Sequence, residues 1–286
     1  MRLLRRTEGG EAAGPGSGDT LRADAATTCG HDVEISGEDL LRAVAAEARP
    51  TPADRPWVTL NMVASVDGAA SGVEGRSASL SGPADRELFL TLRSVADLVL
   101  AGAGTIRAED YGAPRPVPGA GELRAARGQA PLPRLVIVSG RLRLDPDARV
   151  FQEATPETRP IVLTTRQAAA AVEGDADGPA AVLATRADIR PVGEVELDWK
   201  QAMRLLREEY GARMVLSEGG PTTNAQLLAH DLVDELCLSV APLIIGGGAQ
   251  RIVGAVPPLM PLSLSLDRMM EDQGFLLLRY LRVGRD

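Results

Sequence analysis

The chain of 286 residues contains few of the residues that bind metals, nucleic acids or membranes. Its two histidines, His31 and His230, are too few for a histidine-rich metal site, so no metal is expected. Its two cysteines, Cys29 and Cys237, lie far apart without a Cys/His cluster, which favours a reduced, cytoplasmic setting. Lys200 is the only lysine and the net charge is −8, which argues against a nucleic-acid-binding surface, because such a surface needs clustered positive charge. No apolar run reaches about 18 residues, so no membrane span is expected either.

The composition that remains is ordinary for a globular protein, with 44% hydrophobic and 24% charged residues. Residues 1–32 contain little that could be buried, so we expect a disordered leader there. Residues 33–55 predict a short helix with Ser36 as its N-cap, followed by a proline-rich entry. Residues 56–286 are then expected to form a single domain.

Strands and helices alternate through this domain. Residues 58–66 alternate in polarity with a period of two, which predicts a strand that ends at Asp67. Asp198 is expected to cap an amphipathic helix, with Gln201 at its third position and Gly211 at its end. The pattern predicts a three-layer α/β domain around one sheet, with at least one antiparallel edge because the last strands follow each other without a helix. We expect strands at 57–66, 98–101, 135–138, 161–163, 181–183, 214–216, 235–241 and 274–283, helices from near 83, 198 and 221, and loops at 112–133 and 174–179.

The segment 97–110 is the first candidate for ligand binding. Its apolar run stops at Gly102-Ala103-Gly104-Thr105, and a polar stretch with Glu109 and Asp110 follows. Small residues at the carboxyl end of a strand let a phosphate or a sugar approach the backbone without meeting a Cβ. That end of an open α/β sheet is also where ligands bind. Because the third glycine of a dinucleotide fingerprint is missing, an ordinary turn is the alternative.

A second junction of this kind follows the strand at 214–216. The sequence continues as Glu218-Gly219-Gly220-Pro221-Thr222-Thr223, where a helix is expected to begin. The free backbone N–H groups and the positive end of a helix together attract an anion. Two such junctions along one sheet edge would suit a dinucleotide, which carries a pyrophosphate and a distant sugar. Alternatively, Gly219 and Gly220 only permit close packing of strand and helix, and the spacing leaves both interpretations open.

Several segments, taken in order, resemble one known family. The run at 58–68 is similar to the first strand of the reductase domain of riboflavin biosynthesis. The other similar segments, in the same order and spacing, are 80–82, 102–109, 218–222, 232–235 and 241–242. An ordered set across about 56–283 is hard to obtain by chance. More narrowly, the chain resembles stand-alone actinobacterial members that lack the deaminase half.

The resemblance implies a dihydrofolate-reductase-like fold, with a central mixed, mostly parallel sheet flanked by helices, and a homodimer. It implies NADPH as hydride donor and a small-molecule substrate, a pyrimidine of the 5-amino-6-(5-phosphoribosylamino)uracil type. The reaction opens the ribose to ribitol. Such an enzyme must align the nicotinamide C4 with the sugar C1′, hold a phosphate and supply a proton.

The family's functional residues carry over to matching positions of this chain. Ser139 matches a position near the adenosine end of the cofactor, and Arg141 is a candidate to reinforce a 2′-phosphate there. The expected cofactor-binding residues are Val63, Gly102, Gly104, Thr105, Ser139, Gly219, Gly220, Pro221, Thr222 and Thr223. The expected substrate-binding residues are Ser77, Arg93, Arg115 and Glu218.

Two departures from the family pattern lie on the substrate side. The family has an aromatic residue before the threonine of its Trp-Ile-Thr-Gly motif, whereas this chain reads Ser79-Leu80-Ser81-Gly82, so a stacking surface is lost. Where the family has Ala-Asp-Asn-Pro, this chain has Ala108-Glu109-Asp110-Tyr111. Glu109 aligns with the family's acid, and Asp110 lies beside it, so we expect one of the two to be the catalytic carboxylate. Tyr111 is the one aromatic beside the expected site and a candidate replacement for the lost stacking partner.

Three functions stay open. The first is reduction of the ribosylamino-pyrimidine phosphate. The second is reduction of dihydrofolate or another pterin, in which Glu109 or Glu218 would bind or protonate the ring. The third is NADPH binding without catalysis. Among the remaining residues, Asp67 is expected in a strand-end turn, with a proton donor as the alternative, and Cys237 in the core.

Overall fold

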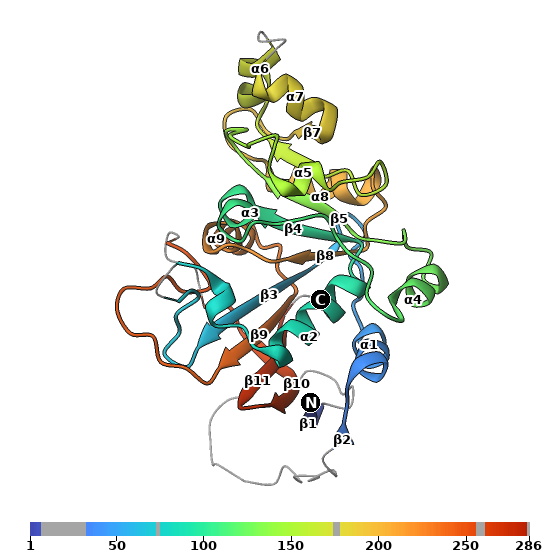
Figure 1. The fold of residues 1–286 in the computed structure, drawn as a ribbon, viewed down its shortest axis with the longest axis vertical. Helices are drawn as coiled ribbons and strands as arrows, with labels where there is room; N and C mark the ends of the chain where they lie inside the picture. The colour runs from blue at the N-terminus through green and yellow to red at the C-terminus, as the bar shows by residue number, and fades with distance from the viewer. Residues whose placement is uncertain (7–32, 73–74, 174–177, 256–260, 285–286) are drawn as a thin grey trace.

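The computed structural model describes residues 1–6, 33–72, 75–173, 178–255 and 261–284. Within these ranges one sheet contains the strands β1 (Arg2–Arg6), β2 (Val33–Glu34), β3 (Trp57–Ser65), β4 (Leu98–Gly102), β5 (Arg134–Val138), β6 (Ile161–Thr164), β7 (Asp188–Pro191), β8 (Met214–Ser217), β9 (Glu235–Ala241), β10 (Leu264–Asp272) and β11 (Phe275–Arg282). Their order is β2-β1-β10-β11-β9-β3-β8-β4-β5-β6-β7 (Figure 1). No helix of the described chain is long and apolar enough to cross a membrane.

The sheet has a parallel half and an antiparallel half. From β9 through β3, β8, β4, β5 and β6 to β7, neighbouring strands are parallel. From β9 through β11, β10 and β1 to β2, they are antiparallel. The expected mixed sheet with an antiparallel edge is therefore confirmed. In the parallel half, the carboxyl ends of β3, β4, β5 and β8 meet at one edge, which is where a ligand site is expected.

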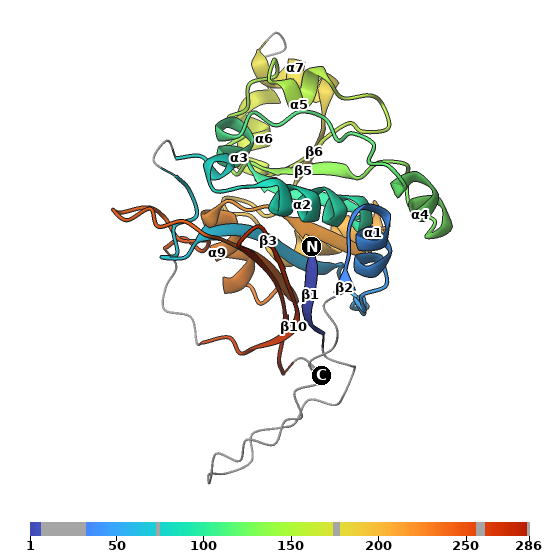
Figure 2. The ribbon, with the colours of Figure 1, turned by 60° about the horizontal axis from the view of Figure 1, so that its bottom comes forward.

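Helices cover both faces of the sheet, which confirms the three layers. The helical segments are α1 (Gly37–Ala45), η1 (Ser77–Ser79), α2 (Pro83–Val95), α3 (Ala103–Ala108), α4 (Ala120–Ala126), α5 (Arg149–Gln152), α6 (Arg166–Glu173), α7 (Pro179–Arg186), α8 (Trp199–Glu208) and α9 (Pro221–Ala229). One core cluster joins α1, α2 and α5 to one face, and a second joins α8 and α9 to the other. Figure 2 shows α1 and α2 on one side of the sheet and α9 on the other.

Two predicted elements have the structure that their sequences indicate. Asp198 caps α8, because its Oδ1 accepts the backbone N–H of Gln201 at 2.9 Å. The period of two at 58–66 does form the strand β3, but Thr59 and Asn61 are buried as well as the apolar residues. The reason is that β3 lies in the middle of the sheet, with helices on both faces.

Two local predictions are wrong. Residues 181–183 were expected in a strand, but they lie in α7, and the strand at this place is β7. A short apolar run does not distinguish the two, and here Pro179 in the first turn and the alanine-rich sequence favour the helix. The expected loop at 112–133 contains α4, which begins after Gly119 in a left-handed conformation. Residues 174–177 of the other expected loop lie outside the described residues.

The amino-terminal residues also differ from the expectation. Residues 1–32 were expected to be a leader without structure, but residues 2–6 form β1, which pairs with β10 and β2. The N-terminal ammonium donates to the Ile35 carbonyl at 3.0 Å. A strand that adds to a sheet edge through its backbone needs few apolar side chains, so composition gave no signal of it. Residues 7–32 of the expected leader lie outside the described residues.

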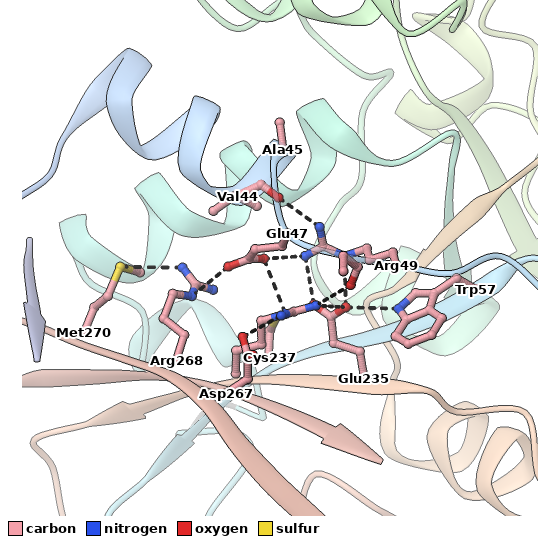
Figure 3. Close-up of polar contacts among 12 residues, drawn as sticks. Val44, Ala45, Glu47, Arg49, Trp57, Glu235, Cys237, Asp267, Arg268 and Met270 are labelled. Carbon is pink, nitrogen blue, oxygen red and sulfur yellow. Dashed lines mark hydrogen bonds and ion pairs between the residues drawn. The ribbon is translucent and has the colours of Figure 1, made fainter. Parts of the chain in front are cut away.

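A buried cluster of paired charges joins the segment after α1 to the antiparallel half (Figure 3). The Glu235 carboxylate accepts hydrogen bonds from Arg49 Nε at 2.9 Å and Arg279 Nε at 3.0 Å. Glu47 pairs with Arg49 at 2.7 Å and with Arg268 at 2.9 Å. Burial alone would raise the pKa of Glu235, but the neighbouring guanidinium groups outweigh it and hold that pKa below its usual value. We refer to these five residues as the buried charge cluster.

Cys237 is fully buried next to this cluster, which confirms its expected place in the core. Its thiol lies 3.4 Å from a Glu235 oxygen. Burial and the Glu235 carboxylate both raise the pKa of the Cys237 thiol, so it stays protonated and chemically inert.

Candidate active site

A cavity of about 1040 Å³ opens at the carboxyl ends of the parallel strands. Its wall includes Val63 at the end of β3, Gly102 at the end of β4, Val138 at the end of β5 and Glu218 directly after β8. This is the edge at which both glycine junctions were expected to lie. The cavity therefore brings together segments that are far apart in the sequence, as an open α/β sheet does at its ligand site.

The two glycine junctions pack against each other in this wall. The Gly102 N–H donates to the Gly219 carbonyl at 2.7 Å. A Cβ on Gly102 would lie 2.6 Å from Thr223 Oγ1, and a Cβ on Gly220 would lie 2.8 Å from Thr105 Oγ1. Both glycines are thus required by the close approach of the junctions. Close packing, one of the two interpretations of the second junction, therefore applies to Gly220, and the same close approach accounts for the glycine at position 102.

Gly104 differs from these two glycines. It is the second residue of α3, it lines the cavity, and a Cβ placed on it would meet no atom within 4 Å. Packing therefore does not require a glycine at this position. The absence of a side chain here leaves room in the cavity, as a ligand close to the backbone needs.

Helix α9 points its amino-terminal end at the cavity. Its cap Gly220 and its first three residues all line the wall, and Gly219 behind it has a φ of +83°. The first N–H groups of a helix have no partner within the helix, and the helix dipole adds positive potential there. This end of the cavity is suited to an anion such as a pyrophosphate.

The structure brings nine of the ten expected cofactor-binding residues into this wall. Gly219 is the exception, because it lies behind the lining and a Cβ there would contact Met62 Sδ at 3.2 Å. The nine lining residues are Val63, Gly102, Gly104, Thr105, Ser139, Gly220, Pro221, Thr222 and Thr223.

The wall of the cavity also contains a carboxylate that is held by two donors of one residue. The Glu109 Oε1 atom accepts the Ser77 backbone N–H at 2.7 Å and the Ser77 hydroxyl at 2.9 Å. Both residues line the cavity. Ser77 was expected to contact a substrate phosphate, but in this structure it orients Glu109.

Glu218 is held beside them by Arg93 and Tyr111. The Arg93 guanidinium donates to both Glu218 oxygens at 2.6 Å, and the Tyr111 hydroxyl donates to Glu218 Oε2 at 2.6 Å. Arg93 also lies over the Phe89 ring, 4.2 Å from its centroid, and 5.3 Å from that of Tyr111. Glu218, Tyr111 and Phe89 line the cavity, whereas Arg93 lies behind them.

This arrangement fixes the protonation of the two partners of Glu218. Burial disfavours the charged guanidinium, but the Glu218 carboxylate more than compensates and raises the pKa of Arg93. Burial, followed by the nearby Glu218 carboxylate, raises the pKa of Tyr111 well above its usual value. Tyr111 therefore remains a hydrogen-bond donor to Glu218 across the physiological pH range.

Three of the residues expected to bind the substrate or to act in catalysis lie outside the lining of the cavity. Arg93 binds Glu218 and offers no free guanidinium to a substrate phosphate in this arrangement. Arg115 is largely exposed, with Glu153 at 3.7 Å. Asp110 pairs with Arg149 at 2.9 Å, and its side chain is 61% exposed. Of the two carboxylates expected at the catalytic position, only Glu109 lines the cavity.

The sequence analysis missed several lining residues. Phe89 lies one helical turn before Arg93 on α2, and Thr165 directly follows β6 at the same sheet edge. The position of Thr165 after an apolar strand was a usable signal, because every strand of the parallel half ends at this edge. Arg107 and Arg143 also line the cavity, together with the expected Arg141. In the described chain, no carboxylate forms an ion pair with these three guanidinium groups.

Asp67 has a structural role near the cavity. It accepts hydrogen bonds from the Ser65 hydroxyl at 2.5 Å and from the N–H groups of Gly246 and Ile245. The Ser65 hydroxyl and then these N–H groups lower the pKa of Asp67 to about 2. It therefore holds the loop after β9 against the end of β3, as expected of a strand-end turn, and is ionised at neutral pH.

A known family model matches most of the chain. Residues 56–274 match the model of the RibD C-terminal domain. The chain belongs to this family. The resemblance to the reductase domain of riboflavin biosynthesis is thereby confirmed.

Named relatives are found in archaea, yeast and bacteria. The chain is 30% identical over 196 residues to the 2,5-diamino-6-ribosylamino-4(3H)-pyrimidinone 5′-phosphate reductase of Archaeoglobus fulgidus, covering 68% of this chain and 83% of that protein. It is 26% identical to the enzyme of the same name from Saccharomyces cerevisiae, covering 69% of this chain and 76% of the relative. It is 27% identical to riboflavin biosynthesis protein RibD of Mycobacterium tuberculosis, of which it spans 44%.

Solved structures confirm the fold. A pyrimidine reductase-like protein from Corynebacterium diphtheriae has a TM-score of 0.73 at 24% identity, covering 88% of this chain and all of that one. The Saccharomyces cerevisiae reductase Rib7 has a TM-score of 0.56 at 20% identity, covering 86% and 97%. The expected fold of the riboflavin-type reductase domain is thus confirmed.

Proposed function

We propose that this protein is an NADPH-dependent reductase that acts on a ribosylaminopyrimidine 5′-phosphate and opens its ribose to ribitol. The observation that carries the proposal is one cavity whose wall combines two kinds of binding group. It contains an anion-attracting helix end with an open glycine, and two oriented carboxylates. The names of the relatives from Archaeoglobus and yeast support this substrate class.

The cofactor fits the end formed by the two glycine junctions. Thr105, Thr222 and Thr223 and the free N–H groups at the start of α9 would hold the pyrophosphate, and Gly104 leaves space beside the backbone. When bound, NADPH supplies the hydride. Val63 and Ser139 line the wall on either side of this segment.

The proposed preference for NADPH over NADH rests on three arginines that form no ion pair with a carboxylate in the described part of the chain. Arg141 and Arg143, which follow Ser139 beyond the end of β5, line the cavity together with Arg107 on α3. A 2′-phosphate is a dianion that guanidinium groups bind with paired hydrogen bonds, and an unmodified ribose offers them nothing comparable. We therefore expect these arginines to favour the phosphorylated cofactor.

The two carboxyl groups of the wall, Glu218 and Glu109, would bind and protonate the substrate. The pyrimidine ring carries amino and ring N–H donors, and Glu218, fixed by Arg93 and Tyr111, accepts hydrogen bonds at one edge of the cavity. Glu109, held by Ser77, is the carboxyl group that can deliver a proton as the ribose ring opens. Tyr111, the candidate replacement for the lost stacking partner, holds Glu218 through its hydroxyl.

The decisive experiment measures NADPH oxidation with the ribosylaminopyrimidine 5′-phosphate, in its uracil and diaminopyrimidinone forms, and separately with dihydrofolate. We expect oxidation with the pyrimidine and formation of the ribityl product, and none with dihydrofolate. Turnover of dihydrofolate alone would establish a pterin reductase. Binding of NADPH with no substrate reduced would leave a non-catalytic protein, and either result would contradict the proposal.

The catalytic carboxylate is tested by two variants assayed side by side. Glu109→Gln should reduce kcat by about 100-fold or more, as expected on loss of a general acid. Asp110→Asn is the matched control, because Asp110 pairs with Arg149 at the surface, and it should leave kcat within about twofold. A loss of activity confined to Asp110→Asn would contradict the assignment of Glu109.

We also propose that two copies of the chain pair through the outer face of β9 and β11. On this face Leu236, Leu238, Val240, Leu276, Leu278 and Tyr280 lie opposite each other in register and stay partly exposed. Of these six side chains, Leu236 packs against the core cluster that contains α8 and α9, and the other five are not among the residues of that cluster. An exposed apolar face of this kind is typical of a homodimer interface. Sedimentation should show a dimer that Leu278→Asp dissociates.

A further inference from the structure

A second cavity, of about 390 Å³, lies at the opposite edge of the sheet. Its wall includes Asp97 and Arg213, which directly precede β4 and β8, together with Arg127 at the end of α4 and Arg49 after α1. The strands that end at the active-site cavity thus begin here. The volume lies within the range of small-ligand sites, which starts at about 300 Å³.

Three arginines line this cavity, and in the part of the chain that the structure describes two of them form no ion pair with a carboxylate. The third, Arg49, forms ion pairs with Glu47 and Glu235 in the buried charge cluster. Arg127 Nη1 instead donates to the Ala45 carbonyl at 2.9 Å, and Arg213 Nη2 donates to the Arg127 carbonyl at 2.5 Å. Among the described residues no carboxylate forms an ion pair with either group, and each keeps further N–H donors free.

The one carboxylate in the wall is engaged by other donors. Asp97 Oδ1 accepts from Gln129 Nε2 at 2.6 Å, and Oδ2 accepts the backbone N–H groups of Arg213 and Met214 at 2.8 Å. These bonds fix the start of β8 against the start of β4. Asp97 forms no ion pair with Arg127 or Arg213 in the described chain, although its charge partly offsets theirs.

A further guanidinium raises the positive charge around this cavity. Arg124, one helical turn before Arg127, is 1% exposed and donates only to backbone carbonyls, at Ala130, Ser94 and Ala96. Burial, and then the nearby Arg49, lower the pKa of Arg127, which indicates that its charge is poorly compensated. An arginine nevertheless remains protonated, so the repulsion persists at neutral pH.

We propose that this second cavity binds a phosphate group, free or carried on a small metabolite, between the guanidinium groups of Arg127 and Arg213. An oxyanion would take up their free N–H donors in paired hydrogen bonds and remove the repulsion among the arginines. Thr51, which also lines the cavity, donates its hydroxyl to the Arg213 carbonyl at 3.3 Å and so helps to hold Arg213 at this wall. The site is separate from the reductase cavity and shares no lining residue with it.

Calorimetric titration of the full chain tests the proposal, with inorganic phosphate in one arm and ribose 5-phosphate in the other. The protein is kept saturated with NADP⁺, so that the positions for the cofactor phosphates in the first cavity are occupied, and the ionic strength is held constant with chloride. We expect one bound phosphate group per chain that depends on Arg127 and Arg213, and any phosphate at the proposed substrate position is recognised because substitution of these arginines leaves it unchanged. In the double variant Arg127→Met, Arg213→Met the affinity should fall by about tenfold or more, whereas NADP⁺ affinity should not change.

The control is Arg204→Met, which removes an exposed arginine from α8, and it should bind phosphate like the wild type. If the double variant does not fold, Arg213→Met alone suffices, because its side-chain hydrogen bond goes to one backbone carbonyl of an exposed segment. Equal binding by wild type and variants, or no binding by the wild type in either arm, overturns the proposal. Binding in one arm alone identifies whether the free ion or the phosphomonoester is the ligand. A failure of NADP⁺ to bind would contradict the proposed function without affecting this comparison.

Discussion

The parallel and antiparallel halves of the sheet contain the same types of charged residue in different roles. At the carboxyl edge of the parallel half, Glu218 and its partners Arg93 and Tyr111 border a cavity, and small residues leave the strand ends open. In the antiparallel half, Glu235 is fully buried between Arg49 and Arg279 and no ligand can reach it. The surroundings, and not the ion pair itself, decide whether a carboxylate serves binding or architecture.

The two halves should also differ in how the loss of a charge affects the stability of the fold. A buried ion pair contributes little net stability relative to an apolar pair, yet removing one partner is expensive, because the other charge stays buried without compensation. The antiparallel half should therefore respond to a charge deletion by unfolding. The parallel edge should respond to small changes by losing ligand affinity while the fold persists. Three variants test this contrast.

The largest effect is expected for Glu235→Gln, which removes the central carboxylate of the buried charge cluster. Arg49 and Arg279 would then be buried with less counter-charge, so the free energy of unfolding should fall by about 3–5 kcal/mol in urea denaturation. The exposed Glu122→Gln on α4 is the control and should change it by less than about 0.5 kcal/mol. Equal stability of both variants would refute a structural role for the cluster.

A smaller effect, on binding alone, is expected for Gly104→Ala. The added Cβ meets no protein atom, and alanine is the better helix former, so the fold should be at least as stable as before. The methyl group would take up space where the cofactor approaches the backbone, and NADPH affinity should fall by about tenfold or more. Gly121→Ala on α4 makes the same change in open space away from the cavity and should leave the affinity unaltered. Unaltered affinity in both variants would place the cofactor elsewhere.

The fold was largely predictable because its signals are local. Asp198 as a helix cap and the period of two in β3 depend on neighbours within a few residues, and both are observed. The elements that were misassigned depend on distant partners or on weak local preferences. Residues 2–6 form a strand only because β10 offers its edge, and residues 181–183 carry an apolar run that fits either structure.

The position of the site could be predicted, because the ends of the strands can be located from the sequence. Nine of the ten expected cofactor-binding residues line the cavity. Seven of them lie in the two glycine-rich junctions, which mark the sheet edge, whereas Val63 and Ser139 were expected from the family resemblance. Side-chain pairing was not predictable. That Arg93 would bind Glu218, and that Asp110 would face Arg149, depends on rotamers and on contacts between elements over 35 residues apart in the sequence.

The smallest effect is expected for Tyr111→Phe, which deletes one hydroxyl at the substrate end. Arg93 would still hold Glu218 through two hydrogen bonds, so the carboxylate should keep its place and lose one of its three hydrogen bonds. A hydrogen bond of this kind contributes about 1 kcal/mol, so we expect KM for the pyrimidine to rise about fivefold, with NADPH affinity unchanged, in steady-state kinetics. Tyr210→Phe is the matched control, since its hydroxyl binds Arg190 far from the cavity, and it should leave KM as it is. A drop in kcat without a change in KM would show that Tyr111 acts on the proton transfer itself. The charged groups at the parallel edge would then serve catalysis as well as binding.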